Sequence, residues 1–279
     1  MKKLLSCSVS VILMCLCMSS SAFADKNLVI AVNANWPPMQ MKDSKGNISG
    51  YEVDLLKAIA EEAGFKVRMV NVPWRNIFNG LKAGRYHAVM ASVSITDARK
   101  EKFDFSESYF TAEQILLVPK AKVNARFAGK TMGVFKLTTG AETLRSTQGC
   151  NITYYTVEET DQAFKDLSRG FVDGVLCDSP VAYNYAAKYK GRFVLKGDAC
   201  ALAKKSANEE YGIAVKKGDS QTLDLINKGL KALKDKGIEA KIREKWFKGI
   251  LLASGEKKQG SMLASEIMAG ARKSPASDK

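Results

Sequence analysis

Two kinds of apolar segment alternate along most of the chain. Short, continuous apolar runs such as residues 28–32 and 88–91 are typical of strands buried on both faces. Between them lie longer segments with apolar side chains at helical spacing. In residues 51–63 these side chains fall on one helical face, and Gly64 follows as a C-terminal cap. This alternation of strands and helices predicts an α/β protein with largely parallel sheets.

The predicted elements form two units with the same strand–helix–strand–helix–strand order. We expect the extended strands 114–118 and 211–215 to join the units, so that the chain crosses twice between two lobes. The other predicted strands are 28–32, 67–70, 88–91, 132–135, 152–155 and 172–177, and the predicted helices are 51–63, 77–83, a helix from the 138–140 turn to about 147, then 160–167, 183–189, 221–233 and 238–247.

The predicted lobes are built from separate stretches of the chain. Residues 25–110 and 211–250 are expected to form the first lobe, and residues 111–210 the second. Ligands of open α/β sheets bind outside the carboxyl ends of the strands. Polar clusters at 92–99 and 177–179 follow predicted strands, so we expect a binding site in the cleft between the lobes.

The N-terminus has the pattern of a secretory signal peptide. Lys2 and Lys3 precede an apolar run over residues 9–18, which is too short to span a membrane. A small-x-small sequence ends at Ala24, so residues 1–24 are predicted to be removed after this position. We therefore expect a soluble exported protein.

The formal net charge is +14 at pH 7. Export and the scattering of Lys and Arg over many elements argue against a nucleic-acid partner. Solubility, attraction to the anionic cell envelope and steering of anionic ligands all remain open as reasons for the charge. Residues 251–279 are polar and poor in apolar side chains, so they are expected to form a flexible tail.

Three cysteines remain after the predicted leader: Cys150, Cys177 and Cys200. An odd number in an oxidising compartment allows at most one intramolecular disulfide. Our hypothesis is that Cys150 pairs with Cys200 and that Cys177 stays a thiol.

The segment after the strand at 88–91 has the chemistry of a ligand clamp. Small hydroxyl residues follow the strand, and Arg99 lies just beyond them. A guanidinium in this position can hold a carboxylate by two charge-assisted hydrogen bonds. The alternative is a surface arginine that follows a helix cap at Thr96 and Asp97.

Several short motifs occur in the order and spacing of one protein family. Over residues 28–247 the chain resembles the periplasmic substrate-binding proteins of polar amino-acid ABC transporters, bacterial solute-binding protein family 3. The motifs are Trp36-Pro37-Pro38, Gly50-Tyr51-Glu52-Val53-Asp54-Leu55, Ser94-Ile95-Thr96-Asp97-Ala98-Arg99, Phe105-Ser106-Glu107-Ser108-Tyr109, Val175-Leu176-Cys177-Asp178 and Tyr211-Gly212-Ile213-Ala214.

The resemblance implies a fold and a function. The fold would be the two-lobed type II periplasmic-binding-protein fold, in which each lobe is a mostly parallel sheet flanked by helices and two crossover strands form the hinge. The protein would capture a polar L-amino acid by closing its lobes and deliver it to a membrane permease. It would be a monomer without a cofactor.

The resemblance also implies the binding residues. Arg99 would hold the ligand α-carboxylate, helped by the hydroxyl and N–H of Ser94 and the N–H of Thr139. Asp178 would take the α-ammonium, aided by the carbonyl of Ala91 or Ser92. Two tryptophans would form aromatic walls, unless they only pack in the core. The full expected set is Asn33, Trp36, Trp74, Ala91, Ser92, Ser94, Arg99, Thr139 and Asp178.

Three departures from the family pattern and two cations bear on the ligand. Asn33 stands where many relatives have an acid, which favours neutral polar or acidic amino acids over cationic ones. Cys177 suggests either a smaller subsite or a buried thiol. Leu137 replaces a glycine before the Thr138-Thr139 turn. The cations Arg75 and Lys136 either face the cleft and favour an acidic side chain or lie on the surface.

Two other functions stay open. Some proteins on this scaffold are periplasmic dehydratases, but His87 is the only histidine and is expected at the strand end away from the cleft, so Cys177 has no evident base. One histidine and three spread cysteines show no metal-ligand spacing. The second alternative is a sensory module that reports the ligand to a separate membrane receptor.

Overall fold

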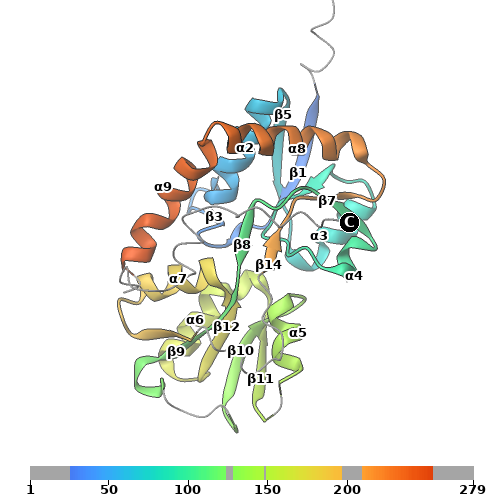
Figure 1. Cartoon of the computed structure of the whole chain (residues 1–279). Coiled ribbons are helices and arrows are strands. Elements are labelled where there is room, and N and C mark those ends of the chain that lie inside the picture. Colours follow the sequence, from blue (N-terminus) through green and yellow to red (C-terminus); the bar gives the residue numbers. More distant parts are fainter. Residues whose placement is uncertain (1–25, 124–127, 148, 197–208, 254–279) are drawn as a thin grey trace, which may run out of the picture.

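Two α/β lobes, each built around a five-stranded sheet, make up the protein (Figure 1). The computed structural model describes residues 26–123, 128–147, 149–196 and 209–253. The predicted leader, Cys200 and nearly all of the predicted tail lie outside the described residues.

The sheet of lobe 1 has the strand order β5-β1-β6-β15-β7. The first three strands are parallel, and β15 and β7 complete the sheet with antiparallel pairing. Continuous apolar sequence in β1 fits its central place, because a strand covered on both faces needs no polar side. The lobe contains β1 (Asn27–Val32), α2 (Tyr51–Ala63), β5 (Lys66–Asn71), α3 (Trp74–Lys82), β6 (Ala88–Val89), α4 (Asp97–Lys100), β7 (Phe103–Phe105), β15 (Ala214–Lys216) and α8 (Ser220–Asp235), with a small sheet of β2 (Asn35–Trp36), β3 (Gln40–Lys42) and β4 (Ile48–Ser49).

The sheet of lobe 2 has the order β11-β10-β12-β9-β13. Parallel pairing of β10 with β11 and β12 repeats the arrangement of lobe 1, and β9 again adds antiparallel pairs. The lobe contains β9 (Gln114–Pro119), the 3₁₀ turn η1 (Lys120–Lys122), β10 (Thr131–Phe135), α5 (Thr139–Arg145), β11 (Asn151–Tyr155), the 3₁₀ turn η2 (Val157–Glu159), α6 (Thr160–Arg169), β12 (Gly174–Asp178), α7 (Ser179–Lys188) and β13 (Phe193–Lys196).

The predicted crossover strands were placed too far along the chain. The lobes are joined by β8 (Phe110–Ala112) and β14 (Glu209–Tyr211), which pair antiparallel and run side by side (Figure 1). The run 114–118 is buried within the sheet of lobe 2, and Ala214–Lys216 belongs to the sheet of lobe 1. Both predicted runs are apolar because they are buried inside the sheets of the lobes. The strands that do connect the lobes, β8 and β14, are only three residues long.

Most other predicted elements are confirmed within a few residues, and their ends have local causes. Helix α2 spans the predicted range, and Gly64 ends it in the left-handed conformation that glycine favours (φ 80°). Helix α3 begins at Trp74 rather than at residue 77, directly after Pro73. Helix α7 starts at Ser179, immediately after β12, with a proline in its first turn. Asp178 is therefore held at a strand-to-helix junction.

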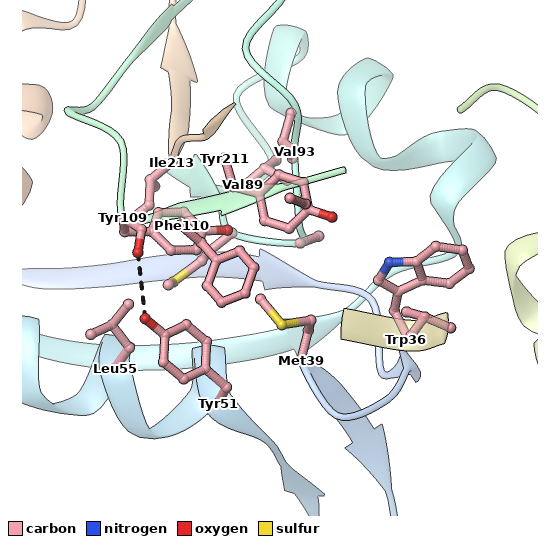
Figure 2. Packing of buried hydrophobic residues seen from close by; sticks show 14 of the residues in the cluster. Trp36, Met39, Tyr51, Leu55, Val89, Val93, Tyr109, Phe110, Tyr211 and Ile213 are labelled. Atoms are coloured by element: carbon pink, nitrogen blue, oxygen red, sulfur yellow. Dashed lines mark hydrogen bonds between the residues drawn. The ribbon is translucent and has the colours of Figure 1, made fainter. Parts of the chain in front are cut away.

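An aromatic cluster links the core of lobe 1 to the crossover strands (Figure 2). Tyr51 of α2 meets the Phe110 ring edge-on at a centroid distance of 5.5 Å, and Phe110 stacks on Tyr211 at 5.7 Å. All three side chains are fully buried. Burying a large apolar side chain contributes about 1.5–3 kcal/mol. The crossover strands are thus anchored in lobe 1, with Tyr211 reaching from the core toward the cleft.

The C-terminal helix α9 (Ile238–Ala253) packs on both lobes. It contacts α2 in lobe 1 and α7 in lobe 2 (Figure 1). Arg243 on this helix is buried, with its guanidinium 4.8 Å from the Phe110 ring centroid and an ion pair to Glu239. In the part of the chain that the structure describes, no helix is both long and apolar enough to cross a membrane.

Candidate functional site

A cavity between the lobes brings the predicted binding residues together. Its volume is about 20 Å³, roughly the space of one water molecule. A ligand larger than a water molecule can therefore enter only when the lobes or the lining side chains move. Lobe 1 contributes Asn33, Trp36, Trp74, Ala91, Ser92, Ser94 and Arg99, and lobe 2 contributes Thr138, Thr139, Val157 and Asp178. All nine residues expected from the sequence are in this set.

Asp178 ends β12, and its carboxylate is held by three donors. Gln114 Nε2 donates to Oδ1 at 2.5 Å, while Trp36 Nε1 at 3.3 Å and the Tyr211 hydroxyl donate to Oδ2. Burial, followed by the nearby charge of Glu209, raises the pKa of Asp178. A cation in the cavity would oppose both effects, because it favours the ionised carboxylate.

Arg99 faces the cavity from the short helix α4. Thr96 caps this helix by accepting a hydrogen bond from the Arg99 N–H at 3.3 Å. The guanidinium donates to the Ser94 carbonyl at 2.7 Å and lies 5.7 Å from the Trp74 ring centroid. Burial lowers the pKa of Arg99, and the negative charge of Glu209 opposes that change. The helix cap expected from the sequence is therefore present, and the Arg99 side chain beyond it lines the cavity.

A buried carboxyl group stands behind the lobe 1 side of the cavity. Ser92 has a left-handed backbone (φ 50°), and both its N–H and its hydroxyl donate to Glu52 Oε1, at 2.8 and 3.0 Å. The Tyr109 hydroxyl donates to the same oxygen at 2.5 Å. Burial raises the pKa of Glu52 to about 7, and its Oε2 has no hydrogen-bond partner among the residues that the structure describes.

The hydroxyl groups of the cavity all give their protons to oxygens of the protein. Ser92 donates to Glu52, and Thr138 donates to the Phe135 carbonyl at 2.7 Å. Ser94 and Thr139 donate to Glu209 Oε2 at 2.6 and 2.7 Å. A hydroxyl has one proton and two lone pairs, so each of the four offers only acceptor positions to a ligand.

The nitrogen donors of the lining side chains are committed in a similar way. The Asn33 amide donates to the Val72 carbonyl and to Glu158 Oε1, both at 3.0 Å. The indole N–H of Trp36 points to Asp178, and that of Trp74 donates to the Leu137 carbonyl at 3.1 Å. Arg99 has five N–H groups, one of which donates to Ser94. Among the described lining side chains, Arg99 is thus the one with N–H groups still available to a ligand.

A larger outer cavity of about 700 Å³ adjoins the first and shares Trp74, Arg99 and Thr139 with it. Arg75 lines it together with Lys82 and Lys102. Lys136 is exposed and lines neither cavity. Of the two cations considered from the sequence, only Arg75 faces the cleft, and it does so outside the inner cavity.

Three other residues discussed in the sequence analysis, Cys177, Leu137 and His87, lie outside the inner cavity. Cys177 is buried in β12 away from the cavity lining, which fits the buried-thiol alternative. Leu137 is exposed and has a left-handed backbone (φ 63°). The glycine that the family pattern has at this position adopts such a backbone without strain. His87 accepts a hydrogen bond from the Val29 N–H at 3.0 Å and lies outside both cavities. Within the described residues, no group of three or more His, Cys, Asp or Glu side chains could hold a metal ion.

Three polar residues that organise the site were missed from the sequence. Gln114 joins Asp178 and Glu209, and it fits because Gly140 has no side chain; a Cβ there would lie 2.6 Å from Gln114 Oε1. Glu158 reaches Asn33 and the Trp74 N–H from lobe 2. Glu209 begins β14, two residues before Tyr211 of a recognised motif. That spacing places its side chain on the same face of the strand as Tyr211, which was the available signal.

The chain matches a known protein family over most of its length. The model of the bacterial extracellular solute-binding proteins, family 3, matches residues 28–249. The chain belongs to this family. Its members bind amino acids and work with ABC transporters.

Relatives and solved structures extend the comparison. A probable histidine-binding protein of Neisseria gonorrhoeae is 35% identical over 225 residues, covering 78% of this chain and 82% of the relative. An ancestral arginine-binding protein was solved with glutamine and with arginine. Both structures are 32% identical and cover 79% of this chain, with TM-scores of 0.70 and 0.71 and coverage of 97% and 98% of the solved chains. An ancestral amino acid-binding protein described as a precursor of cyclohexadienyl dehydratase is 31% identical, with a TM-score of 0.71 and coverage of 79% and 95%.

The family and the two-lobed type II fold expected from the motifs are thus confirmed. Curated relatives are named as binding proteins for histidine, cystine and arginine. They are not named as enzymes, although one structural neighbour is a dehydratase precursor. This ligand range includes cationic amino acids, which the Asn33 argument had placed behind neutral polar and acidic ones.

Proposed function

We propose that this protein captures a free L-amino acid between its lobes and delivers it to the membrane permease of an ABC transporter. The observation that carries the proposal is that Arg99 of lobe 1 and Asp178 of lobe 2 line the same cavity. A guanidinium and a carboxylate at a fixed separation match the two charged ends of an amino acid. Ser94, Thr139 and the carbonyl of Ala91 or Ser92 complete the proposed contacts.

Capture requires that the ligand favour the closed arrangement of the lobes. Hydrogen bonds that cross the cleft next to the cavity include those from Trp36 to Asp178, from Trp74 to Leu137 and from Asn33 to Glu158. A bound amino acid adds an ion pair on each side. Since the lobes close over these charges, the pairs form in a poorly hydrated space where they are stronger.

For the ligand side chain, we propose a hydrogen-bond donor. Both protons of the Asn33 amide are already used, and the Glu158 carboxylate lies beside it. An acidic side chain would find acceptors and a negative charge there. We therefore keep neutral polar amino acids as proposed ligands, add cationic amino acids, and no longer favour acidic ones. Glutamine, histidine and arginine all carry donor groups, in keeping with the ligands named for relatives.

The remaining parts of the proposal come from the sequence. The predicted leader would place a monomeric protein in the periplasm, where its partner is a permease. A separate membrane receptor is the alternative partner, and a pull-down from membranes distinguishes the two. The proposed role is binding without chemical change, so a bound amino acid should be recovered intact by mass spectrometry.

Calorimetry against the twenty L-amino acids tests the function. We expect at least one to bind with a dissociation constant near micromolar, about −8 kcal/mol. Arg99→Ala should lose about 2–5 kcal/mol of that affinity, because a buried carboxylate would lack its partner. Lys100→Ala, the next cation on α4, is the matched control and should bind normally. Undiminished binding by Arg99→Ala would overturn the assignment.

A further inference from the structure

Glu209 connects the two lobes through the floor of the cleft. It begins the crossover strand β14, and its Oε2 accepts hydrogen bonds from Ser94 of lobe 1 at 2.6 Å and from Thr139 of lobe 2 at 2.7 Å. Its Oε1 accepts from Gln114 Nε2 at 3.1 Å. Ser94 and Thr139 line the cavity, but Glu209 does not. Glu209 therefore acts on a ligand through these two hydroxyls.

The direction of these hydrogen bonds decides what the hydroxyls can bind. An ionised carboxylate only accepts, so Ser94 and Thr139 must both donate to it. Each hydroxyl then has only lone pairs left for the cavity. In this state neither hydroxyl can donate to a ligand carboxylate, although the family resemblance had implied that role for the Ser94 hydroxyl. Both hydroxyls can instead accept a hydrogen bond from an ammonium group.

Charge reinforces this selection. One nitrogen, Gln114 Nε2, donates to both Asp178 Oδ1 and Glu209 Oε1, at 2.5 and 3.1 Å, so the two carboxylates lie side by side. The negative charge of Glu209 contributes to the raised pKa of Asp178. Two neighbouring carboxylates attract a cation more strongly than one does.

We propose that Glu209 is a positioning residue of the ammonium subsite, which turns the Ser94 and Thr139 hydroxyls into acceptors and adds a second negative charge beside Asp178. This inference rests on the proposed function. It assigns the discrimination of the α-ammonium to a carboxylate that the ligand does not touch. Among the side chains, the α-carboxylate is then left to Arg99, while the backbone N–H groups of Ser94 and Thr139 keep the role proposed for them.

Paired ligands test this role. The probes are L-histidine, L-arginine and L-glutamine, each compared by calorimetry with the analogue that carries hydrogen in place of the α-ammonium. Glu209→Gln removes the charge and brings an amide to the two hydroxyls. We expect about a tenfold loss of affinity for the amino acid that binds, since a hydrogen bond to a charged group is at stake. The matching analogue should keep its affinity within about twofold.

A second readout is the number of protons that the protein releases when the ligand binds. Because the pKa of Asp178 is raised, binding an ammonium at neutral pH should release protons from the wild-type protein. Calorimetry in phosphate and in Tris, whose ionisation enthalpies differ, measures that release. Glu209→Gln should release fewer protons, because burial still raises the pKa of Asp178 but the added effect of the Glu209 charge is gone. A purely structural defect would not change this quantity selectively.

Glu210→Gln is the matched control, since Glu210 is the exposed neighbour on the same strand. It should change neither readout. Should Glu209→Gln not fold, Glu209→Asp keeps the charge but has a shorter reach to the two hydroxyls, so it should give a smaller loss of affinity that is still selective for the amino acid over the analogue. Equal losses for amino acid and analogue, or no loss for either, would overturn the role of Glu209 while leaving the proposed function intact. A wild-type protein that binds no amino acid would overturn both.

Discussion

The indole N–H of Trp74 donates a hydrogen bond to the carbonyl oxygen of Leu137 at 3.1 Å, joining lobe 1 to lobe 2 beside the cavity. The backbone N–H of Trp74 also crosses the cleft, to Glu158 of lobe 2 at 2.9 Å. The same indole lies against Arg99. Trp74 is therefore both a wall of the cavity and a contact that exists only while the lobes are together.

Trp74→Phe should weaken ligand binding by favouring separated lobes. The substitution removes the indole donor and keeps an aromatic ring. A hydrogen bond of this kind contributes about 0.5–1.5 kcal/mol, so we expect a loss of affinity of roughly two- to tenfold by calorimetry. Trp246→Phe is the control: Trp246 Nε1 donates to Asp54 at 2.8 Å within lobe 1. An equal loss in both variants would contradict a specific role for the Trp74 contact.

Leu137→Gly should stabilise the protein. Leu137 is 66% exposed and has a φ of 63°, a left-handed backbone that costs a residue with a side chain about 1–2 kcal/mol. Glycine removes this cost but gains freedom in the unfolded chain, worth about 0.5–1 kcal/mol. We expect a net gain of about 0.5–1 kcal/mol in the free energy of unfolding, measured by denaturant titration. Leu137→Ala keeps the Cβ and should show no gain; a gain there would contradict the backbone explanation.

Glu52 should make the stability of the protein depend on pH. Its pKa is about 7 in the folded protein against an ordinary 4.5, so the folded state holds a proton that the unfolded state releases. The stabilisation is complete below pH 4.5 and is lost as the pH rises through 7. The shift corresponds to about 3 kcal/mol.

Glu52→Gln removes this titration and keeps a similar shape. Between pH 5 and pH 8, the free energy of unfolding should fall less in this variant than in the wild type. Glu61→Gln, on the same helix and exposed, is the control and should keep the wild-type slope. Parallel slopes for the wild type and Glu52→Gln would show that Glu52 is ionised throughout this range.

The sequence was informative where short motifs and buried strands coincide. Arg99 and Asp178 could be placed because each comes at or just after the carboxyl end of an apolar strand, which is where ligands of open α/β sheets bind. Glu158 and Glu209 could not, because an acidic residue in a turn or at a strand start usually faces solvent. Their roles depend on the approach of the other lobe, a contact that no local pattern encodes. The crossover strands were misplaced for a similar reason, since apolar content marks burial and not the point where a chain leaves a sheet.

The C-terminal helix α9 rests on α2 in one half of the molecule and on α7 in the other. Bending at β8 and β14 alone would pull α7 away from it. A hinge movement of the lobes would therefore have to change the packing of α9 on α7 as well as the contacts around the crevice. The stability of the closed arrangement thus includes a helix contact at the outer edge of the molecule, well away from the crevice itself.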